Sequence, residues 1–293
     1  MHKNLALRVS HINIVNNIIL AVSKIIIGII AHSSALLNDG INNAGDVISS
    51  IIASIGISAG ARDSDKNHQY GHERLECVAA ILLSGIIMVV GLGLFVDGLS
   101  TIIQKSYIDQ PTPGILAVAA AGLSIIIKEI MFLYTRSAAK KTNSSALKAS
   151  AWDSQSDVLA TTGGLIGILF ARYGFPIADS IAAIIIALFI FRVGIEIFRD
   201  GMDKMVDRAC EETMVRDIRS VILDQQGVKG VDVLRTRTFG SRCYVDVEIS
   251  AEGSQSLFEA HSIAERVHHA IEKNFPQVKH CMVHVNPVKK NLQ

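Results

Sequence analysis

The sequence predicts an α-helical membrane protein with six transmembrane helices and a C-terminal α+β domain. Of its 293 residues, 49% are hydrophobic and only 19% are charged, which is too apolar for an ordinary soluble chain of this length. Long apolar runs fill the first two thirds of the chain, and charges become frequent from about residue 206. We therefore predict a transmembrane domain over residues 1–205 and a cytoplasmic domain over residues 206–293.

The apolar runs give the predicted spans. A helix needs about 20 mostly apolar residues to cross a bilayer. Six runs meet this need, at about residues 12–31, 34–58, 77–102, 113–135, 149–171 and 177–198. The first run is interpreted as a transmembrane helix because it is long enough to span and lacks a convincing signal-peptide cleavage site. Lys and Arg gather on one side of the runs, with Lys105 and Arg172 on the other, so both termini are predicted to be cytoplasmic.

The C-terminal domain alternates between two periodicities. Residues 211–226 and 256–274 have the spacing of helices, whereas residues 228–238, 242–250 and 279–286 alternate like strands. This order predicts a small αββαβ domain.

Charge and cysteine usage exclude some classes of protein. The net charge is only +1, which gives no support for a nucleic-acid partner. The four cysteines, Cys77, Cys210, Cys243 and Cys281, include no C-x-x-C pair. This spacing argues against a zinc ribbon or a disulfide framework, so we expect reduced thiols.

Two pairs of polar residues stand within predicted spans. Asp153 and Asp157 are four apart in the fifth run, and Asn42 and Asp46 are four apart in the second. A spacing of four places each pair on one helix face. One such pair could be a hydrogen-bond contact between helices. Two matching pairs with three carboxylates need a counter-cation, and they predict a divalent metal site with these four ligands.

Other charges also lie within the spans. Lys24, Lys128, Glu129, Arg192 and Glu196 are expected to form pairs between helices, or else to snorkel to the membrane edge.

The chain resembles the cation diffusion facilitator family over nearly its whole length. Besides the two polar pairs, the segments SALLND at residues 34–39 and YGHERLE at residues 70–76 closely follow the family's most recognisable segments. The resemblance implies a homodimeric exporter in the cell inner (plasma) membrane that exchanges divalent metal for protons by alternating access. It also implies a metallochaperone-like cytoplasmic domain that dimerises and senses metal.

The ligand types bear on which metal is carried. Zinc-transporting members usually have His or Asp at the position of Asn42, and often His at that of Asp153. A set made only of oxygen donors suits Mn²⁺ better than Zn²⁺, and it resembles the family's manganese-exporting branch. Affinity order alone favours zinc or iron over manganese, so a zinc, iron or cadmium exporter is the alternative. No resident cofactor is expected.

Proton coupling would involve the same residues. Three carboxylates within a few ångströms cannot easily all stay charged without the metal, so we expect them to bind protons as a unit. The roles of Asp39 and Asn43 stay open.

Three further features are implied by the resemblance. A loop metal site would be formed by Asp65, His68 and His72, although loop histidines are often merely solvated. A cytoplasmic-domain site would use His261 and His284, with Asp232, Glu248 and Asn286 where zinc-binding relatives tend to have His, His and Asp. A salt bridge would link Arg74 to Asp207.

Two other classes of function are alternatives to transport. A scaffold or metal sensor could keep the fold without transporting metal. A site that no longer binds metal would tolerate apolar residues at its ligand positions, whereas all four positions here carry oxygen ligands. An enzyme has the least support, since no nucleophile–base pair or phosphate loop is visible. Gly163 and Gly164 indicate close helix packing instead.

Overall fold

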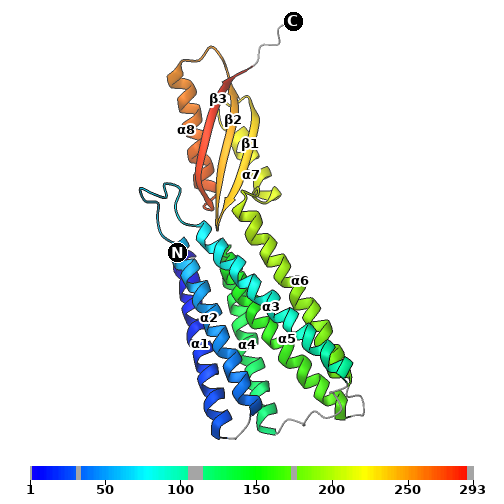
Figure 1. Cartoon of the computed structure of the whole chain (residues 1–293). Helices are drawn as coiled ribbons and strands as arrows, with labels where there is room; N and C mark the ends of the chain where they lie inside the picture. Colours follow the sequence, from blue (N-terminus) through cyan, green and yellow to red (C-terminus); the bar gives the residue numbers. More distant parts are fainter. Residues whose placement is uncertain (1, 31–33, 105–114, 173–176, 289–293) are drawn as a thin grey trace. The chain divides into compact units, whose positions relative to one another are not determined.

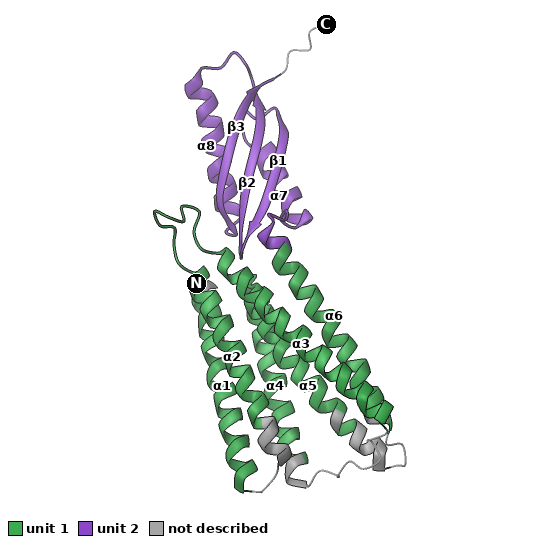
Figure 2. Ribbon diagram, in the orientation of Figure 1, with its two compact units in different colours: residues 1–202 green, residues 203–293 purple. Residues whose placement is uncertain are grey.

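A computed structural model describes the backbone of the chain except residues 1, 31–33, 105–114, 173–176 and 289–293 (Figure 1). The chain divides into two compact units, Met1–Met202 and Asp203–Gln293 (Figure 2). The first unit is helical, and the second is an α+β domain.

The described part of the first unit contains six long helices. They are α1 (His2–Ile30), α2 (Ser34–Gly60), α3 (Arg74–Gln104), α4 (Ile115–Thr142), α5 (Ser145–Arg172) and α6 (Ile177–Met205). With 27 to 31 residues each, they are roughly 40 Å or more in length. They extend beyond the predicted apolar runs because the helical backbone continues into polar flanks, as in α4, whose last turn includes Lys140 and Lys141.

Four segments are long and apolar enough to cross a membrane, judged over the described residues. They are Asn4–Ile30, Arg74–Gln104, Val118–Thr142 and Ser180–Met205, in α1, α3, α4 and α6. The two helices outside this set, α2 and α5, are the ones that carry the predicted ligand pairs. The count of six spans thus stays a prediction for these two helices.

The first unit exposes apolar side chains and buries polar ones. Large residues such as Ile30, Val89 and Ile185 are exposed, whereas Asn13 and Lys128 are buried. This distribution suits a bundle whose outer surface faces lipid, because hydrocarbon offers no partner to a polar group. The polar interior is where a site for a charged ligand can form.

Small residues let α3 and α6 approach closely. A Cβ atom added at Gly91 would lie 3.1 Å from the backbone nitrogen of Phe191, and one at Gly98 would lie 3.2 Å from the carbonyl oxygen of Ser180. Gly163 of α5 is similarly crowded by the Ile186 side chain, which confirms the packing role expected for it. Small residues are the usual means of close helix contact in membranes.

The second unit has the predicted αββαβ order. Its elements are α7 (Glu212–Leu223), β1 (Gly230–Phe239), β2 (Arg242–Ala251), α8 (Leu257–Asn274) and β3 (Val278–Pro287). Strand β2 lies between β1, to which it is antiparallel, and β3, to which it is parallel. Gly240, with a φ of 62°, makes the turn between β1 and β2. The core packs Ile222 of α7 and Val267 of α8 against Val247 of β2.

The expectation of four reduced cysteines was wrong for one pair. Cys210 and Cys243 form a disulfide across 33 residues of sequence. Cys210 precedes α7, and its backbone nitrogen donates a hydrogen bond to the hydroxyl of Thr236 in β1. The β1–β2 hairpin then brings Cys243 next to it, a proximity that sequence spacing does not reveal. Cys77 and Cys281 are free and buried, and burial raises the pKa of the Cys281 thiol to about 12.

The contact between α3 and α6 gives a stability prediction. We expect Gly91→Val to lower the free energy of unfolding by about 1–3 kcal/mol because the new side chain meets the α6 backbone. The matched variant is Gly93→Val on the same helix, since no atom lies within 4 Å of a Cβ added at Gly93. Detergent-titration unfolding of the purified protein measures both. Equal losses for the two variants would contradict the close contact.

Candidate metal site

A buried lysine joins two of the predicted ligands. The Lys128 ammonium on α4 donates hydrogen bonds to Oδ2 of Asp46 on α2 and to Oδ2 of Asp157 on α5, both at 2.6 Å. The side chain of Lys128 is 3% exposed, against 15% for Asp46 and 34% for Asp157. The pairing expected for Lys128 is thereby confirmed, and its partners are two of the carboxylates predicted to be metal ligands.

Asp153 belongs to the same electrostatic cluster. It lies one turn before Asp157 on α5, and it interacts electrostatically with Asp46, Asp157 and Lys128. Three acidic residues from two helices therefore lie near one ammonium group, which is hydrogen-bonded to two of them. Three acidic side chains in a poorly solvated interior can supply oxygen ligands to a cation.

The asparagines of α2 are arranged differently from expectation. Asn42 is exposed, so its place in the ligand set stays a prediction. The neighbouring Asn43 is 4% exposed, and its amide nitrogen has no hydrogen-bond partner among the described residues. The helical spacing placed Asn43 about 100° from the ligand face. The side chain of Asp39 lies outside the described residues.

A polar stripe on α1 was missed by the sequence reasoning. The Asn17 amide donates hydrogen bonds to the Ser50 hydroxyl at 2.8 Å and to the Asp46 carbonyl at 3.4 Å. The Asn13 amide donates to the hydroxyl of Thr135 at 3.1 Å, and the hydroxyl of Tyr134 donates to Asn13 Oδ1. These contacts join α1 to α2 and α4. The signal was available in the sequence, because three polar residues share one face of an apolar helix at Ser10, Asn13 and Asn17.

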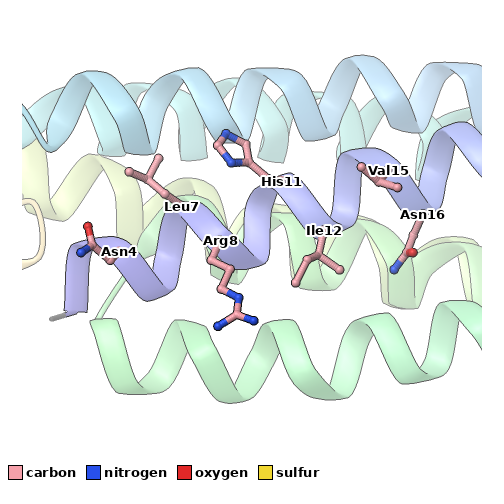
Figure 3. Close-up of a pocket in the computed structure, with 7 residues that line it drawn as sticks. All are labelled: Asn4, Leu7, Arg8, His11, Ile12, Val15 and Asn16. Atoms are coloured by element: carbon pink, nitrogen blue, oxygen red, sulfur yellow. The ribbon is translucent and has the colours of Figure 1, made fainter.

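A separate hollow lies along the N-terminal half of α1 (Figure 3). This open surface hollow of about 520 Å³ is lined by Asn4, Leu7, Arg8, His11, Ile12, Val15 and Asn16. None of the predicted ligands lines it, so it is distinct from the carboxylate cluster.

The loop between α2 and α3 brings together the three residues predicted there. Potential ligand atoms of Asp65, His68 and His72 all lie within 4.8 Å of one another. Asp65 is 3.3 Å from His68 Nδ1 and 3.4 Å from His72 Nε2. The same carboxylate accepts hydrogen bonds from the backbone nitrogens of His68 and Asn67, at 2.7 and 2.8 Å. Chiefly because of the bond from His68, the pKa of Asp65 lies below its ordinary value of 3.8.

The second unit brings together part of its predicted set. The Asn286 amide donates hydrogen bonds to Asp232 at 3.1 Å and to Glu248 at 3.3 Å, and His284 is the register partner of Glu248 in the parallel pair. His261 is an exposed residue of α8 next to Glu265. In the described part of the chain, no hydrogen bond or ion pair joins His261 to Asp232 or Glu248.

Arg74 and Asp207 fall in different compact units. The salt bridge between them stays a prediction.

Two family models match the chain. The cation efflux transmembrane domain matches residues 10–206, and the cytoplasmic domain of cation efflux proteins matches residues 210–288.

Individual relatives are similar over nearly their full length. The Bacillus subtilis manganese efflux system protein MneP is 29% identical, covering 96% of this chain and 95% of the relative. MneS, a manganese efflux system protein of the same organism, is 31% identical, with 95% and 94% covered. Among solved structures, a MamM CTD variant is 25% identical, covering 26% of this chain and 95% of that one, with a TM-score of 0.26.

The hydrogen bonds to Asp65 predict a pH dependence of the loop. Because the pKa of Asp65 is lowered in the folded loop, the ionised carboxylate stabilises the loop at pH values above 3.8. This stabilisation is lost as the pH falls through the lowered pKa. We expect the amides of Asn67 and His68 to stay protected from hydrogen exchange at pH 5 and to lose protection only below pH 3.8, after correction for intrinsic rates. Asp65→Ala should remove the protection at pH 5 as well, because the accepting carboxylate is gone. Protection already lost at pH 5 in the unaltered protein would contradict the assignment.

Proposed function

This chain belongs to the cation efflux family of membrane-embedded metal transporters, and we propose that it exports Mn²⁺ from the cytoplasm in exchange for protons. The observation that carries the proposal is the cluster of Asp46, Asp153 and Asp157 inside a bundle with an apolar surface. The family consists of transporters and not of enzymes, which supports transport as the activity of this chain.

The donor chemistry supports manganese as the cargo. All three carboxylates are hard oxygen donors, and Mn²⁺ accepts carboxylate, amide carbonyl and water together in six-fold geometry. Zn²⁺ more often has imidazole or thiolate ligands, and none of the four proposed ligands is a histidine or a cysteine. Two relatives named as manganese efflux system proteins, MneP at 29% identity and MneS at 31%, also support manganese as the cargo. Export of Zn²⁺, Fe²⁺ or Cd²⁺ is the alternative.

An amide from α2 would complete the protein's ligand set. We propose Asn42 because it lies one turn from Asp46 on the same helix. Asn43 is the competing candidate, since it is the buried asparagine of this part of α2. In either case the amide carbonyl would bind the metal, and water would fill the remaining positions.

Proton exchange would follow from charge repulsion in the cluster. Like charges that share a poorly solvated site interact strongly, so loss of a divalent cation favours proton uptake by the group as a whole. Alternating access would expose the site first to the cytoplasm and then to the opposite side. We place the protein in the inner (plasma) membrane with both termini in the cytoplasm.

The C-terminal unit would pair two copies of the chain and respond to metal. The family model that it matches is the cytoplasmic domain of cation efflux proteins. Its proposed metal site is formed by Asp232, Glu248, His261 and His284, and the loop site by Asp65, His68 and His72 would be a second regulatory position. The Arg74–Asp207 salt bridge would link the two units.

The main test is transport by the purified protein in proteoliposomes. We expect uptake of Mn²⁺ driven by an imposed pH gradient, with Zn²⁺, Fe²⁺ and Cd²⁺ measured in parallel. Uptake of zinc but not manganese would overturn the metal assignment. If no ion is taken up, the chain would instead be a scaffold or sensor that keeps the fold.

A substitution tests the site within the same assay. Asp157→Ala should abolish Mn²⁺ uptake while the protein still dimerises, because a carboxylate ligand is removed from the centre of the cluster. The matched control is Asp97→Ala, which removes an exposed carboxylate from α3 and should leave uptake unchanged. Normal flux through the Asp157→Ala protein would be fatal to the proposed site.

The amide ligand is tested by two further variants. Asn42→His supplies an imidazole, so we expect the preference between Mn²⁺ and Zn²⁺ to shift toward zinc. Asn43→Ala should leave that preference unchanged. If the Asn43 variant alone changes metal uptake, Asn43 and not Asn42 is the ligand.

A further inference from the structure

We propose that Lys128 is a tethered cation that competes with the transported metal for the carboxylates of Asp46 and Asp157. The inference rests on the proposed function, because it assigns those carboxylates to the transport site. It makes Lys128 a determinant of metal affinity in addition to the metal ligands.

The geometry places the ammonium where a bridging metal would lie. Lys128 Nζ is 2.6 Å from Oδ2 of Asp46 and 2.6 Å from Oδ2 of Asp157, so these two oxygens are no farther apart than twice that distance. A divalent cation binds carboxylate oxygens at about 2.0–2.6 Å. The same two oxygens could therefore coordinate a metal ion at nearly the position that the Lys128 ammonium occupies. The ammonium and the metal cannot occupy it together.

The burial of Lys128 gives the competition its strength. The side chain is 3% exposed, so water does not replace its partners. Hydrogen bonds between charged groups are among the strongest in proteins, and metal entry has to break two of them. Lys24 also interacts electrostatically with Asp46. Lys128 is hydrogen-bonded to carboxylates of both α2 and α5.

This competition suits the task of a transporter. Three carboxylates around one divalent ion could hold it too tightly for release on the far side of the membrane. A cation fixed to α4 offers the carboxylates an alternative partner, which weakens metal binding and favours release. Lys128 would then determine how tightly the site binds the metal and how readily it releases it.

A purely structural role predicts the opposite effect. If Lys128 only held α2 and α5 together, its removal would let the carboxylates separate, and metal binding would weaken. The direction of the change in affinity thus distinguishes the two roles.

The experiment compares Mn²⁺ binding by the full-length protein and its Lys128→Met and Lys128→Gln variants. Both substitutions keep a side chain of similar length and remove the charge. We expect the dissociation constant to fall on the order of tenfold or more in each, because two charge-assisted hydrogen bonds no longer oppose the metal. Lys140→Met, at an exposed lysine of the same helix, is the matched control and should bind as the unaltered protein does.

Two further readouts keep the test decisive. Mn²⁺ should raise the unfolding temperature of the variants more than that of the unaltered protein, and their rate of Mn²⁺ transport should fall because release is slower. Lys128→Gln retains a hydrogen-bond donor, so it provides the measurement if Lys128→Met does not fold.

The outcomes separate this inference from the proposed function. Unchanged or weaker Mn²⁺ binding in both variants, in a protein that transports Mn²⁺, would overturn the role of Lys128 alone. A protein that transports no divalent ion would overturn the proposed function. Tighter Mn²⁺ binding with slower transport would support both.

Discussion

Negative charge held inside an apolar bundle is the constraint on which the arrangement of the helices depends. Asp46 and Asp157 come from different helices, and a carboxylate in hydrocarbon needs a positive partner. Lys128 supplies it at 2.6 Å to each, so α2, α4 and α5 meet at one ammonium group. Asp153, one turn before Asp157 on α5, adds a third acidic side chain to the cluster. The oxygen atoms that compensate the buried lysine are therefore the same ones that would bind the proposed cation.

The surroundings of the cluster follow from the membrane as solvent. Apolar residues cover the outer surface, and polar groups inside bond to one another, as Asn17 does to Ser50 at 2.8 Å. Close approach of α3 and α6 depends on glycines rather than on apolar burial, since lipid gives little driving force for helix association. The second unit follows the rules of a soluble domain. It has its own core, and Ser256 and Glu259 form a capping box at the start of α8.

Much of this fold was predictable because periodicity reports the face of each element. The αββαβ order and the shared face of Asp153 and Asp157 both follow from spacing alone. Spacing does not fix how a helix is rotated against its neighbours, so the partner of Lys128 and the burial of Asn43 in place of Asn42 were not foreseen. The Cys210–Cys243 disulfide was missed for a related reason, since a hairpin and a helix start bring together residues 33 positions apart.

The most direct test of the central claim is to locate manganese in the full-length protein by anomalous scattering at the manganese absorption edge. We expect a peak within bonding distance of the carboxylates of Asp46 and Asp157, with the Lys128 ammonium moved away from both. A peak found only at the loop or in the C-terminal unit, with Lys128 still joining the two carboxylates, would contradict it.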